Sequence, residues 1–579
     1  MEIRERYSVW LNSEALSGEE KEELRELSED TEEIKSRFFS QLEFGTAGLR
    51  GVMGTGLYRM NVHVVRHATQ AFAEVILKDG GSGEKTVVIC FDCRDNSLDF
   101  AREASCVMAA NGIGVLIFDA LRPTPELSFA IREYGCVAGI NVTASHNTSE
   151  YNGYKVYWSD GAQLPPAQAA AVAERMAELD IFTGVKRLDY GAAKEKGLIR
   201  ELGRETDELF LKNVMEMAND FEAVTAVADE FKVVYTPFHG AGYILVPEAL
   251  RRLGVKNLYC VAEQMITDGS FPTVESPNPE NPEGFRLAVK LADEKGADLI
   301  IGTDPDSDRV GIMARDGGGA FIPITGNQTG VLLLDYLAGA KKRAGTMPAR
   351  PIALKTIVST EMVRKVADEN GVRCIDTFTG FKFMAEEKNR LEAADEGKVI
   401  FSFEESYGYM LGDYVRDKDA VSASLLIAEM AAWYFGQGMT LFDALEKMYE
   451  KYGFYIEETI NIYMPGLDGL ARMRRLMDSL RSTPPERISG VGVAAVKDYL
   501  TGEEMDLSSG AKTELTPCGS NVLRFELTDA TSILIRPSGT EPKIKVYVLA
   551  SGVSKRECAD KVKKYADWAE ELDSQPSTK

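Results

Sequence analysis

The chain has 579 residues, which is too long for one hydrophobic core and predicts three or four domains. Hydrophobic residues make up 44% of it and aromatic residues 9%, as in ordinary globular proteins. Its 66 Lys and Arg against 90 Asp and Glu give a net charge of −24, which argues against broad binding to nucleic acid or to an anionic membrane.

The first residues are charged and contain no apolar core of a signal peptide, and no apolar run is long enough to span a bilayer. We therefore expect a cytoplasmic monomer or dimer with no membrane or nucleic-acid partner. Most of the eight cysteines stand alone in apolar surroundings, which predicts reduced core thiols. His63 and His67 have a zinc-compatible spacing, but Val64 stands where a metalloprotease needs glutamate, so packing is favoured.

Residues 1–40 are rich in Glu and Lys and are predicted to form helical arms. The segment Phe44–Gly51 that follows is rich in glycine and carries Arg50. Glycine lets a backbone approach a ligand closely, and an arginine can contact an anion.

An α/β pattern then appears three times, each time as strand, helix, second strand, helix and third strand. Glycine follows the first helix of each copy, as expected at a helix end. The predicted strands are 86–91, 114–118 and 137–142 in the first copy, 232–235, 257–261 and 298–301 in the second, and 352–357, 373–376 and 398–401 in the third.

Each third strand runs into a polar loop. The first loop, Thr143–Lys155, offers Ser145 with a histidine beside it; the second, 302–309, offers three aspartates; the third, 402–408, offers Glu404 and Ser406. Ligands bind at the carboxyl ends of strands in open α/β sheets. If the three units pack around a common centre, we expect these loops to converge there.

Asp304, Asp306 and Asp308 alternate, so on an extended stretch all three face one way. Crowded carboxylates repel unless a cation is present, which predicts a hard divalent metal. Arg309 and Arg315 stand where a calcium EF-hand needs Gly and Glu. Mg²⁺ is favoured because it takes carboxylates together with a phosphate oxygen.

Residues 456–579 differ from the three copies. We expect a strand at 459–463, a long linker, and a strand at 531–535 that enters a loop of Ser, Gly and Thr flanked by cations. Exposed N–H groups and hydroxyls form an anion cradle, to which Arg536 adds a planar fork. A serine, a metal site and a phosphate cradle together suggest phosphoryl transfer through a phosphoserine.

The predicted fold class is α/β, with three similar mixed α/β sandwich domains and a C-terminal α+β domain. The expected domains are 1–204 with the phosphoserine loop, 205–320 with the metal-binding loop, 321–455 with the sugar-binding loop and 456–579 with the phosphate-binding loop.

These motifs resemble the α-D-phosphohexomutase family, the phosphoglucomutase/phosphomannomutase enzymes. The resemblance rests on the loops Thr143–Asn147, Asp304–Arg309, Glu404–Ser406 and Arg536–Thr540, which occur in the expected order. The run Tyr151–Tyr157 most resembles the phosphoglucomutase branch that includes phosphopentomutases. One departure is Thr148, where proline is usual, and it bears on loop rigidity.

The resemblance implies an isomerase of carbohydrate metabolism in which Ser145 carries a phosphate. That phosphate passes to glucose 1-phosphate, and the other phosphate of the resulting 1,6-bisphosphate returns to Ser145, releasing glucose 6-phosphate. One Mg²⁺ per chain is implied, with glucose 1,6-bisphosphate as activator. The implied metal ligands are the Ser145 phosphate, Asp304, Asp306 and Asp308.

The family's other roles are carried over residue by residue. The implied proton-transfer candidates are Arg50 and Lys155, with His146 and Arg309 positioning the phosphate. The implied substrate contacts are Thr379 and Gly380, the sugar-hydroxyl readers Glu404 and Ser406, and the clamp on the idle phosphate, which comprises Arg536, Ser538, Gly539, Thr540 and Lys545.

Several alternatives stay open. The same chemistry on another sugar would make the chain a phosphopentomutase, a phosphomannomutase or a glucose-1,6-bisphosphate synthase. A two-metal enzyme of the alkaline-phosphatase type is disfavoured, because only four histidines are available as ligands. A non-catalytic sugar-phosphate sensor is disfavoured by the intact Ser145 and the three aspartates.

Overall fold

The computed structural model describes residues 2–45, 48–79, 83–464, 469–538 and 543–572. Two compact units divide the chain: Met1–Gly326 with Ser406–Leu441 forms unit 1, and Asn327–Glu405 with Phe442–Lys579 forms unit 2. The limits of the four expected domains stay predictions. Within the described ranges, we find no helix with the length and apolar character needed to cross a membrane.

The expected helical arms are confirmed at the start of unit 1 as α1 (Ile3–Asn12), α2 (Gly18–Glu26) and α3 (Thr31–Phe38). Ser17 and Glu20 form a capping box at the start of α2. The rings of Trp10 and Phe38 meet edge to face at 5.9 Å between centroids. The arms therefore have a small hydrophobic core of their own.

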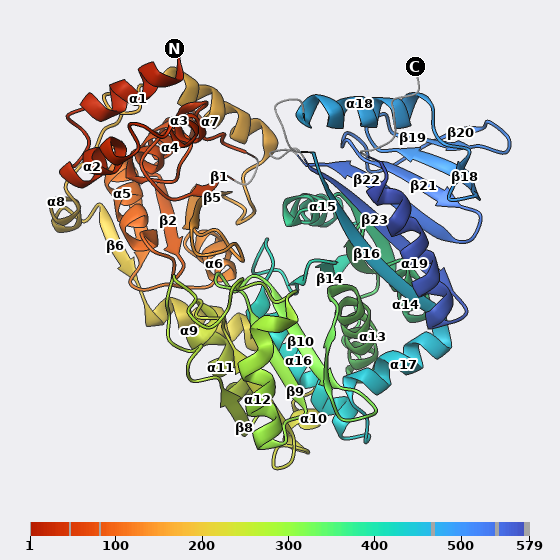
Figure 1. Ribbon diagram of the computed structural model, residues 1–579. Helices are drawn as coiled ribbons and strands as arrows, with labels where there is room; N and C mark the ends of the chain where they lie inside the picture. The colour runs from red at the N-terminus through yellow and green to blue at the C-terminus, as the bar shows by residue number, and fades with distance from the viewer. Residues whose placement is uncertain (1, 46–47, 80–82, 465–468, 539–542, 573–579) are drawn as a thin grey trace. The chain divides into compact units, whose positions relative to one another are not determined.

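The first sheet, of which β1, β2, β5 and β6 are labelled in Figure 1, has the strand order β1-β5-β4-β2-β3-β6. Its strands are β1 (Leu49–Val52), β2 (Thr86–Phe91), β3 (Gly114–Phe118), β4 (Ala138–Val142), β5 (Tyr151–Trp158) and β6 (Ile199–Leu202). The central strand β2 lies parallel to β3 and β4, and β5 returns antiparallel to β4.

Helices cover both faces of this sheet. They are α4 (Val62–Lys78), α5 (Ser97–Ala110), α6 (Thr124–Glu133), α7 (Pro166–Glu178) and α8 (Tyr190–Glu195). Because strand side chains alternate in direction, Val87 and Ile89 join the core formed with α4 and α5, whereas Val88 and Cys90 join the core under α6. The predicted α/β sandwich is confirmed here.

The second sheet, also in unit 1, repeats the plan with the order β11-β10-β9-β7-β8. Its strands are β7 (Lys232–Thr236), β8 (Asn257–Cys260), β9 (Leu299–Thr303), β10 (Val310–Arg315) and β11 (Phe321–Ile324). The helices in this part of the unit are α9 (Arg204–Met215), α10 (Phe221–Thr225), α11 (Gly242–Leu253), the short 3₁₀ turn η1 (Pro282–Phe285), α12 (Arg286–Lys295) and α16 (Ala420–Phe435). Strand β7 is parallel to β8 and β9, as β2 is to β3 and β4.

The third copy lies in unit 2, where β12 (Pro351–Thr356) is parallel to β13 (Arg373–Thr377) and β14 (Lys398–Glu404). The helices of this part are α13 (Gly326–Ala344), α14 (Met362–Asn370), α15 (Phe381–Ala393) and α17 (Leu441–Tyr452). In every copy the first strand is central and the third strand beside it ends in the polar loop. The repeated architecture predicted from the sequence is therefore confirmed.

The C-terminal part of unit 2 is an antiparallel sheet of order β16-β23-β22-β21-β18-β19-β20. Its strands are β16 (Phe454–Tyr463), β17 (Arg487–Ile488, paired with β18), β18 (Val491–Asp498), β19 (Glu503–Asp506), β20 (Lys512–Glu514), β21 (Leu523–Leu527), β22 (Thr531–Pro537) and β23 (Lys543–Gly552), and its helices are α18 (Gly469–Ser482) and α19 (Lys555–Glu570). The expectation of a long linker after residue 463 is wrong. Glycine and alanine interrupt the alternation of apolar and polar residues in β18, so the local sequence did not indicate a strand. Pairing with β21 stabilises the strand.

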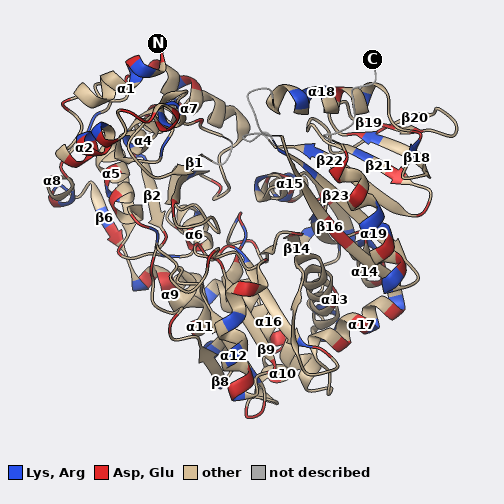
Figure 2. Ribbon diagram, viewed as in Figure 1, with Lys and Arg blue, Asp and Glu red and all other residues tan. Residues whose placement is uncertain are grey.

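Charged residues of both signs are mixed along the helices, as α12 and α19 illustrate (Figure 2). On α19, Lys561 pairs with Glu557 at 2.8 Å, one turn away. Both side chains are partly exposed, and ion pairs in contact with solvent contribute little to stability.

Candidate active site

The loop that carries Ser145 follows β4, as predicted. The Ser145 hydroxyl donates to Asp304 Oδ2 at 2.8 Å and lies 3.2 Å from His146 Nδ1. Ser145 has a φ of +54° and is only 3% exposed. A left-handed conformation is uncommon outside glycine and clusters at functional sites. The fold therefore holds this hydroxyl in an unusual position against an acidic loop.

His146 is a neutral partner of that hydroxyl. Burial lowers its pKa well below the usual value, and the cations Arg309 and Arg50 lower it further. The serine proton points to Asp304, so the remaining acceptor position on Ser145 Oγ suits an Nδ1–H donor. The tautomer with hydrogen on Nδ1 satisfies both groups.

The acidic loop after β9 brings three carboxylates together. One oxygen each of Asp304, Asp306 and Asp308 lies within 4.8 Å of the others. The expected extended geometry is wrong: the chain turns sharply, Ser307 has a φ of +51°, and Asp304 Oδ1 accepts the backbone N–H groups of Asp308 and Arg309 at 3.1 and 3.0 Å. Asp304 caps this turn. The curvature of the turn brings the three carboxylates together, and the alternation of side chains along a strand does not.

The triad suits a hard divalent cation. Burial raises the pKa of Asp304 and of Asp308, and the neighbouring carboxylates raise both further. Among the described atoms, Asp306 Oδ1 and Asp308 Oδ1 are buried without a hydrogen-bond partner. Carboxylate oxygens in this state fit Mg²⁺ by number and by chemistry. This triad is the one such cluster that emerges from the described residues.

Two lysines partly compensate the charge of the triad. Lys155, on β5, donates to Asp306 Oδ2 at 2.7 Å. Burial alone would raise the pKa of Asp306, but Lys155 keeps it below its usual range. Lys418 lies 3.1 Å from Asp308 Oδ2 and was not predicted. The run of charged residues just before α16 could have indicated Lys418 in the sequence, but such a run usually lies on a solvated surface.

The remaining predicted residues of unit 1 surround this centre. Arg50, on β1, donates to Asn147 Oδ1 in the serine loop at 2.9 Å. Arg309 lies 3.2 Å from Glu280 and 3.9 Å from Asp308. The structure thus brings the serine loop, both arginines and the triad together.

Ser406 also belongs to unit 1, where it precedes β15 (Gly408–Met410). The backbone N–H of Val310, directly after the acidic loop, donates to Tyr407 O at 3.1 Å. Ser406 therefore precedes Tyr407, whose carbonyl oxygen is hydrogen-bonded to the first residue of β10, the strand that follows the acidic loop.

In unit 2, Glu404 ends β14 and is buried, and it accepts the backbone N–H of Gly380. Gly380 has a φ of +117°, which a side chain would strain, and it precedes α15. The Thr379 hydroxyl is buried, and no described atom bonds to it. Gly380 of the predicted substrate loop and Glu404 of the predicted sugar loop thus meet within unit 2.

The predicted phosphate clamp lies on the hairpin of β22 and β23. Arg536 and Lys545 are paired residues on the two strands, and Ser538 N donates to Lys543 O at 2.7 Å. Gly539 and Thr540 lie outside the described residues. The two cations therefore flank the start of the predicted cradle. Whether the loops of both units converge stays a prediction.

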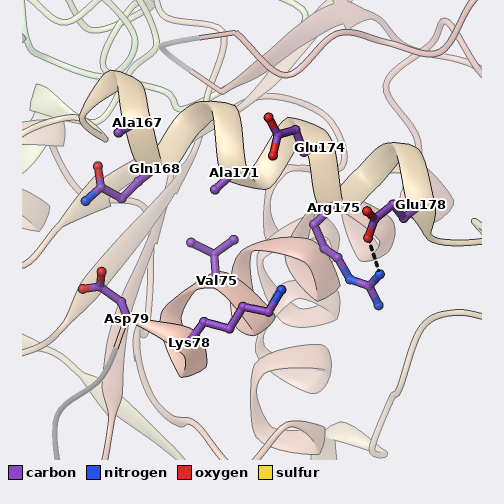
Figure 3. Close-up of a pocket in the computed structure, with 9 residues that line it drawn as sticks. All are labelled: Val75, Lys78, Asp79, Ala167, Gln168, Ala171, Glu174, Arg175 and Glu178. Carbon is purple, nitrogen blue, oxygen red and sulfur yellow. Dashed lines mark hydrogen bonds and ion pairs between the residues drawn. The ribbon is translucent and has the colours of Figure 1, made fainter.

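A shallow hollow of about 370 Å³ lies elsewhere in unit 1, between α4 and α7 (Figure 3). Arg175 at its edge bonds Glu178 at 2.8 Å and Glu74 at 2.6 Å. None of the predicted site residues lines this hollow, so it adds nothing to the catalytic geometry.

Repeated α/β sandwiches that end in a serine loop, a carboxylate loop and a glutamate loop define a multidomain α/β enzyme. Four successive segments match known domains of the phosphoglucomutase/phosphomannomutase type: alpha/beta/alpha domains I, II and III at residues 41–181, 208–318 and 325–452, and the C-terminal domain at 482–564. The chain belongs to the phosphoglucomutase/phosphomannomutase family, as its motifs predicted.

A curated relative agrees with this assignment, and solved structures share the fold. The chain is 37% identical over 517 residues to a phosphoglucomutase of Staphylococcus aureus strain N315, covering 89% of this chain and 91% of the relative. The open form of parafusin (phosphoglucomutase) from Paramecium has a TM-score of 0.68 at 18% identity, covering 93% and 98% of the two chains. A family protein from Burkholderia thailandensis has a TM-score of 0.64 at 18% identity, covering 93% and 99%. At such identities the solved structures support the fold alone.

Proposed function

We propose that this enzyme is a phosphoglucomutase, which interconverts glucose 1-phosphate and glucose 6-phosphate through a phosphoserine at Ser145 and a glucose 1,6-bisphosphate intermediate. The observation that carries the proposal is the 2.8 Å contact between the Ser145 hydroxyl and Asp304 inside a buried carboxylate triad. Glucose is favoured because the S. aureus relative, at 37% identity, is named phosphoglucomutase.

We assign Asp304, Asp306 and Asp308, together with a phosphate oxygen on Ser145, as the ligands of one Mg²⁺. The unpartnered oxygens of Asp306 and Asp308 support this assignment. A bound Mg²⁺ supplies charge neutralisation at the phosphate, which is a principal requirement of phosphoryl transfer.

In the first transfer, a sugar hydroxyl attacks the phosphorus on Ser145. The bond between phosphorus and Ser145 Oγ breaks, and the hydroxyl proton passes to the uncharged form of a proton-transfer group, for which Lys155 and Arg50 are the candidates. The neutral His146 donates to Ser145 Oγ and steadies the negative charge that develops there. Arg309 positions the phosphate from the other end of the acidic loop.

The second transfer runs the same chemistry in reverse, after the bisphosphate has turned. Glu404 and Ser406 are assigned to the sugar hydroxyls, and Thr379 and Gly380 to the substrate loop. The idle phosphate is assigned to the clamp formed by Arg536, Ser538, Gly539, Thr540 and Lys545. A carboxylate such as Glu404 accepts hydroxyls in either orientation of the sugar.

A substrate panel tests the proposal. Glucose, mannose and pentose 1-phosphates are each assayed with the matching bisphosphate as activator, with Mg²⁺ and after its removal by EDTA. We expect the highest kcat/KM with glucose 1-phosphate, dependence on Mg²⁺, and stimulation by glucose 1,6-bisphosphate. Preference for a pentose 1-phosphate would instead favour a phosphopentomutase, and preference for mannose 1-phosphate a phosphomannomutase. Net production of the bisphosphate would favour a glucose-1,6-bisphosphate synthase. A cytoplasmic location and a monomeric or dimeric state belong to the same proposal.

A further inference from the structure

A buried arginine that the proposed mechanism does not use lies beneath the serine loop. The Arg94 side chain is 0% exposed, and its guanidinium donates to the carbonyl oxygens of Thr148 and Tyr151 at 2.8 and 2.9 Å. It also donates to the carbonyl oxygens of Ser145 and Asn147. One cation therefore holds the main chain of the loop at four points around the serine.

A second segment, Ile266–Thr273, holds Arg94 from the other side; we call it the strap. The guanidinium carbon of Arg94 lies 5.0 Å from the centre of the Phe271 ring, a cation–π contact. Gly269 packs so closely that a Cβ there would lie 2.8 Å from Arg94 Cα and 2.5 Å from Asp95 N. The strap thus packs against both the guanidinium and the main chain of Arg94.

His239 fastens both ends of the strap. Its Nδ1 lies 2.7 Å from Ile266 O, and its Nε2 lies 2.8 Å from Thr273 Oγ1. Two residues further on, Ala241 N donates to Pro305 O in the acidic loop at 2.8 Å. The turn that carries His239 therefore contacts both the strap and the loop of the triad.

We propose that Arg94 is the positioning residue of the serine loop and that the strap 266–273 keeps it in place, an inference that rests on the proposed role of Ser145. The loop holds Ser145 at a φ of +54°, which is unfavourable for a side-chain-bearing residue. A planar guanidinium with five N–H donors satisfies several carbonyls at once, whereas a lysine ammonium presents three donors from a single point.

Arg94→Lys tests this inference. We expect kcat to fall about 100-fold, as misplaced reacting groups commonly cause, while KM and the half-saturating Mg²⁺ concentration stay close to wild type. The rate at which glucose 1,6-bisphosphate phosphorylates Ser145, followed by intact mass, should fall in parallel. A defect in folding alone would lower the apparent kcat through a smaller active fraction but leave the rate constant of Ser145 phosphorylation unchanged, and titration of phosphorylatable protein detects that fraction.

Gly269→Ala keeps the inference testable if Arg94→Lys does not fold. It forces the strap and the main chain of Arg94 apart, and Gly317→Ala is its matched control, because a Cβ at Gly317 meets open space. We expect slower Ser145 phosphorylation in Gly269→Ala and none of this effect in Gly317→Ala. Wild-type phosphorylation rates in folded Gly269→Ala or Arg94→Lys, or a loss confined to KM, would overturn the inference. A wild-type enzyme that never becomes phosphorylated would instead refute the proposed function.

Discussion

Lys155 Nζ lies 2.7 Å from Asp306 Oδ2, so a proton-transfer candidate is bound to one of the proposed metal ligands. The same nitrogen is 3.7 Å from Asp308 Oδ2. Thr124 donates to the same Asp306 oxygen at 2.9 Å. Asp306 therefore joins the metal site to the group proposed to move the hydroxyl proton.

Replacing this carboxylate should affect both functions. Asp306→Asn removes one charge from the triad and weakens the ion pair with Lys155, so we expect the half-saturating Mg²⁺ concentration to rise at least about tenfold and kcat to fall. A Mg²⁺ titration of activity and calorimetric metal binding measure the two effects. Unchanged metal binding, or wild-type activity in protein shown to be metal-free, would contradict the single-metal assignment.

Ser145→Ala should abolish turnover, because the Ser145 hydroxyl contacts both Asp304 and His146, whereas the Thr124 hydroxyl that donates to Asp306 belongs to a fully buried residue. The fold should survive, since the loop hydroxyl contributes little to any core. Activity assays and thermal melts give these two results, and intact mass should detect one phosphate on wild type and none on the variant. A phosphorylated and active Ser145→Ala protein would place the phosphate elsewhere.

Much of this architecture was predictable, because buried parallel strands such as β2 and β3 read as continuous apolar runs. The triad was predictable as a cluster of residue types, but its turn geometry was not, since Asp304 reshapes the backbone by accepting N–H groups. Arg94 and Lys418 were missed for a different reason. Their partners are 51 and 110 positions away in the sequence, so only the tertiary fold brings them to the site.

Glu457, on β16, should make unit 2 less stable at alkaline pH. Burial raises its pKa from 4.5 to about 7, and Asn327 Nδ2 lies 3.3 Å from its Oε2. The folded state thus favours the protonated carboxyl. This contribution to stability is complete below pH 4.5 and is lost as the pH rises through about 7.

Glu457→Gln keeps the shape of the side chain and cannot ionise. We expect it to raise the free energy of unfolding by about 1–3 kcal/mol at pH 8 and to have little effect at pH 4.5. Urea melts at both pH values measure this difference, and Glu458→Gln at the exposed neighbouring position is the control. Equal effects of Glu457→Gln at the two pH values would show that its charge is not what matters.

Arg536 offers the sharpest test of the proposed clamp, because the intermediate presents each phosphate to Ser145 in turn and a second site must hold the idle one. Its Nε is buried, and no hydrogen-bond partner for it occurs within the described ranges, so it is available to an anion. Arg536→Ala should raise KM for both monophosphates and the glucose 1,6-bisphosphate requirement, since the intermediate escapes before its second transfer. Arg536→Lys should restore only part of the lost substrate affinity, because an ammonium cannot bind two oxygens in one plane. Activity is measured as a function of glucose 1,6-bisphosphate concentration. If neither the bisphosphate requirement nor KM changes in Arg536→Ala, this hairpin does not bind the idle phosphate.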